Sequence, residues 1–229
     1  DFSDFDIKFP SLGDDAIVFE KGGYLYLYDL NTRKAEKITI RVANEISSAR
    51  SSMVDAGKSI NSTHISPDGE RLIFGARGDI FTVPAKEGIT RNITQRPGSH
   101  DRNGVWSPDG KYIAYISDQS GEDEIYIRHQ DGSGTPVQLT KNADTYKFTI
   151  AWSPDSKKII WNDKLLRLQY VDIDTKEVVV VEQSKEWEIT DFNWSPDSKW
   201  IAYARPERET MTKIILYNTA IKGKTDITD

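Results

Sequence analysis

The residue types that perform most enzyme chemistry are sparse in this chain of 229 residues. It contains no cysteine, which excludes a disulfide framework, a thiolate metal site and a cysteine nucleophile. The three histidines, His64, His100 and His129, lack metal-ligand spacing, and no Gly-x-Ser-x-Gly elbow presents a serine nucleophile. We therefore predict no catalytic residue, no metal site and no cofactor, and we expect the histidines to serve polar packing.

Two charged segments are the remaining candidates for a site. Residues 118–124 hold four carboxylates, but they lack the ligand alternation and the distal bidentate Glu of a calcium loop, so we favour a solvated hairpin tip. Positive groups gather just before and after residue 100, where they would attract peptide carboxylates to an otherwise acidic chain. The alternative is that they are solvated loop charges. The candidate binding residues are Arg96, His100, Asp101, Arg102 and Asn103, with Arg91 preceding them.

The composition excludes several classes of partner. With 36 Asp and Glu against 30 Lys and Arg, the net charge is −6, which argues against a nucleic-acid ligand because such binding depends on neutralising phosphates. The 37% of apolar residues suffice for a globular core. The longest apolar run is about five residues, far below the ~18 that span a bilayer, so we predict no membrane insertion. Residue 1 is Asp rather than Met, so we expect a piece of a longer chain.

A tetrapeptide repeat determines the expected fold. Ser66-Pro67-Asp68-Gly69 returns at residues 107, 153 and 195, at intervals of 41, 46 and 42 residues, and a degenerate copy begins at Ser11. In the copies at 153 and 195, a serine replaces the glycine, so we expect those turns to be mildly strained or differently built. Each copy joins two alternating apolar runs, and two more runs follow. Four short strands in each such period predict the blade of a β-propeller.

The expected architecture is an all-β propeller of five four-stranded antiparallel blades, forming either a five-bladed ring or part of a seven-bladed one. We place a single domain over residues 1–229, with blade units near 5–40, 60–94, 102–140, 148–182 and 189–228. The chain start and the blade start coincide, so we predict no exchange of a terminal strand. Open blade edges would then favour self-association.

Position in the repeat gives several side chains a predicted role. The first strand of each blade should line the channel, which places the residues around 100 at the channel mouth and the Ser-Pro-Asp turns on the other face. Trp106, Trp152 and Trp194 recur at one blade position, and we expect them to pack between blades. In the inserted loop 41–59, Val42, Ile46, Ala49 and Met53 have helical spacing. Because its middle is rich in serine, we favour an extended loop over a short helix.

One segment carries a specific family resemblance. It runs from Gly75-Ala76-Arg77-Gly78-Asp79-Ile80-Phe81 through Thr90-Arg91-Asn92-Ile93-Thr94 to Trp106-Ser107-Pro108-Asp109-Gly110. This segment resembles the second, larger propeller of the tricorn protease family. The Ser-Pro-Asp-Gly repeat alone is also similar to that of TolB-type propellers.

The resemblance implies a non-catalytic module whose channel admits unfolded oligopeptides, in a parent serine peptidase with a PDZ-like domain. The family's propeller has seven blades, and this chain has five repeats. Its peptidase residues lie in another domain, so none is carried onto this chain. The family suggests a cytoplasmic location, and the TolB likeness a periplasmic one. A TolB-like scaffold for a folded partner is the rival hypothesis. A propeller lyase or glycosidase is a weaker third, because the first strands offer no convincing carboxylate pair.

Overall fold

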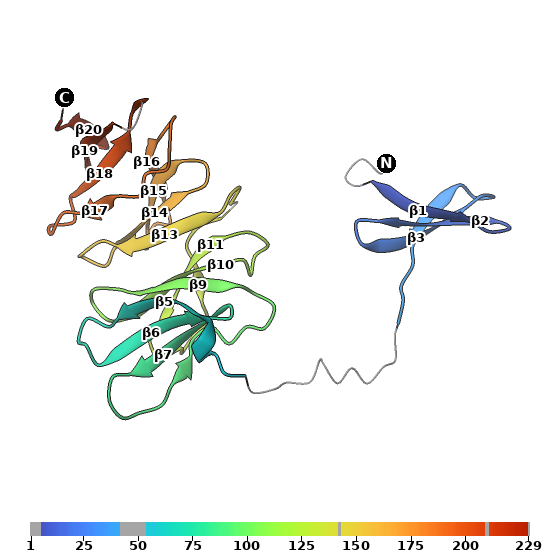
Figure 1. Ribbon diagram of the computed structural model, residues 1–229, viewed down its shortest axis with the longest axis horizontal. Helices are drawn as coiled ribbons and strands as arrows, with labels where there is room; N and C mark the ends of the chain where they lie inside the picture. Colours follow the sequence, from blue (N-terminus) through green and yellow to red (C-terminus); the bar gives the residue numbers. More distant parts are fainter. Residues whose placement is uncertain (1–5, 42–53, 142, 209–210, 229) are drawn as a thin grey trace. The chain divides into compact units, whose positions relative to one another are not determined.

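Five separate sheets make up the protein in the computed structural model, which describes residues 6–41, 54–141, 143–208 and 211–228. Twenty strands form these sheets, four antiparallel strands in each, and helix in the described residues is limited to short 3-10 segments such as Gly57–Ser59 (Figure 1). The four strands of each sheet are consecutive in the sequence. The prediction of five four-stranded blades without exchange of a terminal strand is therefore confirmed.

The chain divides into two compact units, residues 1–53 and 54–229, and each is described by itself. The first unit is a single sheet in which Phe19 is buried and stacks on Tyr26, with ring centres 5.6 Å apart. Its strands are β1 (Ile7–Leu12), β2 (Ala16–Lys21), β3 (Tyr24–Asp29) and β4 (Lys34–Lys37). That all five blades belong to one propeller stays a prediction.

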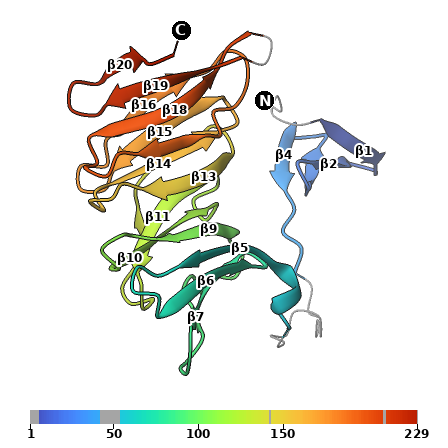
Figure 2. The ribbon, with the colours of Figure 1, turned by 60° about the vertical axis from the view of Figure 1, so that its left-hand side comes forward.

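The second unit stacks four blades one after another (Figure 2). The first two blades are β5 (Ile60–Ile65), β6 (Arg71–Ala76), β7 (Asp79–Pro84) and β8 (Arg91–Asn92), then β9 (Asp101–Trp106), β10 (Tyr112–Ser117), β11 (Glu124–His129) and β12 (Val137–Gln138). The last two are β13 (Lys147–Trp152), β14 (Lys158–Asp163), β15 (Arg167–Asp172) and β16 (Val178–Gln183), then β17 (Phe192–Trp194), β18 (Trp200–Pro206), β19 (Thr212–Asn218) and β20 (Gly223–Asp226).

Apolar clusters between successive blades form the core of this unit. Because side chains alternate between the two faces of a strand, β10 sends Ile113 to the cluster on one side and Ala114 to the cluster on the other. Trp106, Trp152 and Trp194 are each buried in a different one of the three clusters. The prediction that these tryptophans pack between blades is confirmed.

The Ser-Pro-Asp turns share one hydrogen-bond pattern. In the first, the Gly69 N–H donates to the Ser66 carbonyl oxygen at 2.9 Å, and the Ser66 hydroxyl donates to the Asp68 carboxylate at 2.5 Å. Ser156 and Ser198, which replace the glycine, adopt φ of 59° and 60°, close to the 72° of Gly69. These turns are thus built alike, and the serines carry the strain of the left-handed conformation.

The insertion between the first two sheets is described only at its ends. The predicted helical spacing over Val42, Ile46, Ala49 and Met53 lies within residues 42–53, outside the described residues. Immediately before β5, Gly57–Ser59 form a single 3-10 turn.

Candidate functional site

The five predicted binding residues run from the β8–β9 loop into β9, and their surroundings differ. Arg96 and His100 lie in the loop and are exposed, Asp101 and Arg102 are buried, and Asn103 is half-buried. The loop residues are therefore open to a ligand, whereas the β9 residues face neighbouring parts of the protein.

Arg102 joins the β9–β12 blade to the β13–β16 blade. Its guanidinium forms an ion pair with Asp123, donates a hydrogen bond to the Lys147 carbonyl oxygen at 2.8 Å and lies 3.9 Å from the centre of the Tyr146 ring. The Arg102 and Asp123 side chains are 6% and 13% exposed. Arginine suits this position because its planar guanidinium offers several donors in a fixed geometry and stacks on aromatic rings. Arg102 thus holds two blades together.

Asn103 lies at a β-bulge and also bridges these two blades. The register between β9 and β10 shifts between Ala114 and Ile116, and Asn103 has a positive φ of 54°. Asparagine tolerates this conformation better than most residues, and its side-chain amide donates to the Phe148 carbonyl oxygen. The registers of β1, β5 and β13 with their partners shift in the same way. A bulge is therefore a repeated feature of these first strands, and no periodicity in the sequence reveals it.

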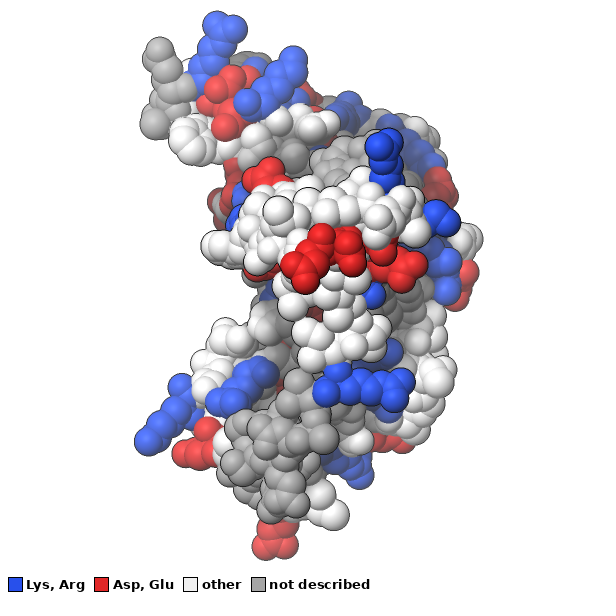
Figure 3. All heavy atoms as spheres, turned by 90° about the vertical axis from the view of Figure 1, so that its right-hand side faces the viewer, with Lys and Arg blue, Asp and Glu red and all other residues white. Residues whose placement is uncertain are grey.

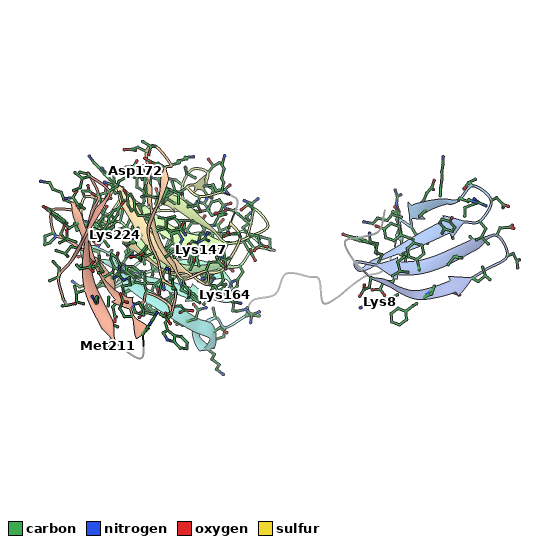
Figure 4. All side chains as sticks on the ribbon, turned by 90° about the horizontal axis from the view of Figure 1, so that it is seen from above. Lys8, Lys147, Lys164, Asp172, Met211 and Lys224 are labelled. Carbon is green, nitrogen blue, oxygen red and sulfur yellow. The ribbon has the colours of Figure 1, made fainter. Side chains whose placement is uncertain are left out.

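A buried charge network lies at the same junction between blades. The Lys147 ammonium, labelled in Figure 4, donates to the Asp123 carbonyl oxygen at 2.5 Å and lies 3.7 Å from the Glu124 carboxylate. Glu124 also accepts hydrogen bonds from the Thr140 hydroxyl at 2.5 Å and the Ala143 N–H at 2.7 Å. Burial lowers the pKa of Lys147, and the two neighbouring carboxylates oppose that shift. The network joins the two blades, and Glu124 and Ala143 also line a cavity of about 320 Å³ beside the 118–124 loop.

The loop at residues 118–124 is only in part the solvated tip that the sequence predicts. Glu122 is exposed, but Asp118 accepts the His100 N–H at 2.7 Å. Asp123 and Glu124 are largely buried in ion pairs. The prediction is wrong for these two residues, because cationic side chains replace the water that their carboxylates lose. Among the described residues, no group of three His, Cys, Asp or Glu is arranged to hold a metal ion.

Two further titratable groups lie in polar positions within this part of the fold. Burial raises the pKa of Asp101, and the hydroxyls of Ser117 and Thr94 oppose the shift. His64 on β5 accepts the backbone N–H of Trp106 at its Nδ1 over 3.3 Å, which links two blades, and burial lowers the pKa of its imidazole. Both groups therefore have structural partners.

A small basic rim remains exposed at the loop end of these blades. Arg96 donates a hydrogen bond to the Gln119 side chain. The turn containing Arg77 and Gly78 lies against His100, since the Asp101 N–H donates to the Gly78 carbonyl oxygen at 2.9 Å. We call Arg77, Arg96 and His100 the basic rim; no sequence motif marks Arg77. Over the described residues coloured in Figure 3, Lys and Arg form separate groups among Asp and Glu.

Comparison with known proteins gives a consistent result. A family model described as "Tricorn protease second beta propeller domain" matches residues 60–229, well over half of the chain. The chain is 26% identical over 207 residues to a tricorn protease homolog of Saccharolobus solfataricus, covering 90% of this chain and 18% of that protein. It is 24% identical over 224 residues to a putative tricorn-like protease C-terminal subunit of Sulfurisphaera tokodaii, covering 97% and 25%. The chain spans at most a quarter of the length of these two relatives.

Solved structures agree at the level of the fold. The crystal structure of the tricorn protease superposes with a TM-score of 0.67 at 22% identity, covering 100% of this chain and 22% of that one. TolB from Acinetobacter baumannii superposes with a TM-score of 0.56 at 21% identity, covering 97% and 54%. The described residues include no helix with the length and apolar character needed to cross a membrane.

Proposed function

Because the chain belongs to the family of tricorn protease second β-propeller domains, we propose that it binds unfolded oligopeptides at its channel mouth and admits them toward a peptidase domain. In this proposal the chain is the non-catalytic propeller of a serine-type peptidase, joined to peptidase and PDZ-like domains in a parent chain. The family match carries the proposal. Two relatives whose names include tricorn protease each align with 90% of this chain, and they support the proteolytic context.

The basic rim supports the location of the peptide contact. Arg96 and Arg77 are exposed cations at the loop end of the blades, in a chain of net charge −6. A cation on an otherwise acidic surface favours the binding of a ligand carboxylate at that point and raises the association rate of the ligand. We therefore expect the C-terminal carboxylate of an oligopeptide to bind near the rim. Arg102 and Asn103 contribute by holding the adjoining blades in place.

Peptide binding to the full chain tests this proposal. Fluorescence anisotropy with labelled unfolded peptides should report binding in the micromolar range. Capping the peptide carboxylate as an amide should weaken binding several-fold. Arg96→Glu should weaken it by about tenfold, since reversing one charge at short range costs on the order of 1 kcal/mol in a high dielectric.

Lys157→Glu is the matched control. Lys157 is exposed in the Ser-Pro-Asp turn between β13 and β14, at the opposite end of the blades, and the change alters net charge equally. This variant should bind like the original chain. If no peptide binds at high micromolar concentration while the blades remain folded, the proposal is refuted. If both variants weaken binding equally, the rim is not the contact.

Self-association through open blade edges stays a prediction. Ile65 on β5 and Ile214 on β19, in the first and last blades of the second unit, are 58% and 39% exposed and support it.

A further inference from the structure

A cavity of about 260 Å³ lies on the turn side of the second unit, at the junction of its first two blades. It lies between the turn that follows β5 and the turn that follows β9. The basic rim precedes β9 and this cavity follows it, so the two occupy opposite ends of that strand. Its lining includes Asp68, Arg71, Trp106, Pro108 and Gly110.

The repeat shows what is missing here. At the next junction the Ser156 hydroxyl accepts the Asp109 N–H at 3.0 Å, and at the following one the Ser198 hydroxyl accepts the Asp155 N–H at 3.0 Å. Each bond ties the turn of one blade to that of the blade before it. Gly110 holds the corresponding position at the first junction and has no side chain to offer Asp68.

The space for that side chain is open. A Cβ atom built on Gly110 would have no atom within 4 Å, and Gly110 has φ of 73°, close to the angles of the two serines. The position therefore admits a serine conformation that the chain already uses twice. With glycine in place, the hydroxyl is absent and its site opens into the cavity.

Two of the residues that line the cavity have a buried donor without an acceptor. The Asp68 N–H lacks the acceptor from the following blade that its equivalents have, and it interacts with its own carboxylate instead. Trp106 is 4% exposed, and its indole Nε1 has no hydrogen-bond partner among the described residues. The Nε of Arg71 is likewise buried without one, whereas its Nη2 donates to the Thr82 and Ile89 carbonyl oxygens. Buried donors are costly to leave unpaired, so the cavity favours an oxygen acceptor.

The charges around the cavity narrow the ligand further. The Ser66 hydroxyl lowers the pKa of Asp68, and the pKa of Asp109 is also lowered, by the Ser107 hydroxyl and the Lys111 N–H against the effect of burial. Both carboxylates are ionised at neutral pH, and Glu70 also lines the cavity. The Lys111 ammonium lies 3.2 Å from the Asp109 carboxylate, so three carboxylates stand against two cations, Arg71 and Lys111. An anionic ligand is therefore disfavoured, whereas a neutral acceptor flanked by positive charge is favoured. The volume fits one or two residues rather than a larger ligand.

From these observations we propose that the cavity binds a basic segment of a partner polypeptide, and that a serine or threonine hydroxyl of this segment occupies the place of the absent turn serine. The hydroxyl accepts the Asp68 N–H as Ser156 accepts its counterpart. Flanking Lys or Arg side chains lie near the Asp68 and Glu70 carboxylates, since Asp109 already pairs with Lys111. This site is independent of the oligopeptide contact at the basic rim.

A ¹H–¹⁵N correlation NMR spectrum of the full chain provides the test. The probe is acetyl-Arg-Ser-Arg-amide, and acetyl-Arg-Ala-Arg-amide is its matched comparison. The serine probe should shift the resonances of the Asp68 amide and the Trp106 indole N–H, with affinity in the millimolar range expected for so small a contact. The alanine probe should bind about tenfold more weakly.

Two glycine substitutions separate binding from folding. Gly110→Ser should fill the cavity and abolish both shifts while the chain remains folded. Gly69→Ser changes the same repeat position in the preceding turn, which has φ of 72° and open space but does not line the cavity, so it should leave binding unchanged. The proposal is overturned if the serine probe causes no shift at about 10 mM, if Gly110→Ser binds it equally, or if the alanine probe binds as well.

Discussion

Replacing Arg102 by alanine distinguishes a residue that holds blades together from one that binds ligand. The substitution removes the ion pair with Asp123, the hydrogen bond to the Lys147 carbonyl oxygen and the stacking on Tyr146. Removing one partner of a buried ion pair costs about 3–5 kcal/mol, mainly because the other charge is left in a poorly solvated place. We expect the lower end, about 3 kcal/mol, because the Asp123 carboxylate keeps the Lys147 N–H at 3.2 Å.

The free energy of unfolding of the full chain is the quantity to measure. Urea titration followed by tryptophan fluorescence should show the loss, and thermal melting should fall by about 6–12 °C for a unit of this size. Arg102→Met combined with Asp123→Leu should recover most of the stability, because no unpaired charge remains. If Arg102→Ala keeps full stability and instead loses peptide binding, Arg102 is a ligand contact and our assignment is refuted.

Two further variants test the contacts between blades. Ser156→Ala should destabilise the chain by about 1–2 kcal/mol in urea titration, because the Asp109 N–H loses its acceptor, and Ser156→Gly should cost about 1 kcal/mol less, because it relieves the left-handed strain; glycine proving the more damaging change would contradict this. The free energy of unfolding should also fall on acidification because of His64. The pKa of His64 is lowered in the folded state, so its contribution to stability is complete above the unfolded pKa of about 6.5 and declines as pH falls from there toward the folded pKa. His64→Gln should remove this component from a series of denaturation curves between about pH 7 and 5, and an unchanged slope would exclude His64 as its source.

Much of the fold could be predicted because its signals are local. The Ser-Pro-Asp turn closes its own hydrogen bonds within five residues, from Ser66 to the Arg71 N–H, so each copy marks a hairpin wherever it occurs. The unbroken apolar run from Tyr112 to Ile116 in β10 is typical of a strand buried on both faces. The recurrence of these signals predicted the number of blades and the tryptophans between them.

The candidate site could be predicted in position but not in role. Arg96 and Arg102 look alike in the sequence, as cations near the start of a blade. In the structure Arg96 is exposed, while Arg102 is buried against Tyr146 and Asp123. Their difference depends on an adjacent blade whose residues lie about 45 positions along the chain, and no local pattern records that pairing.

The sequence alone determined the repeating unit, the turn chemistry and the absence of cysteine chemistry, because each depends on residue type and short-range spacing. The tertiary structure alone decided which charges are buried, where the first strands bulge, and which turn glycine leaves a cavity. Gly110 and Gly69 are equivalent in the repeat. Of the two, only Gly110 lines the cavity, which lies between the turn after β5 and the turn after β9. Such differences arise because contacts between blades join residues that are distant in the chain, and their energies depend on burial that only packing creates.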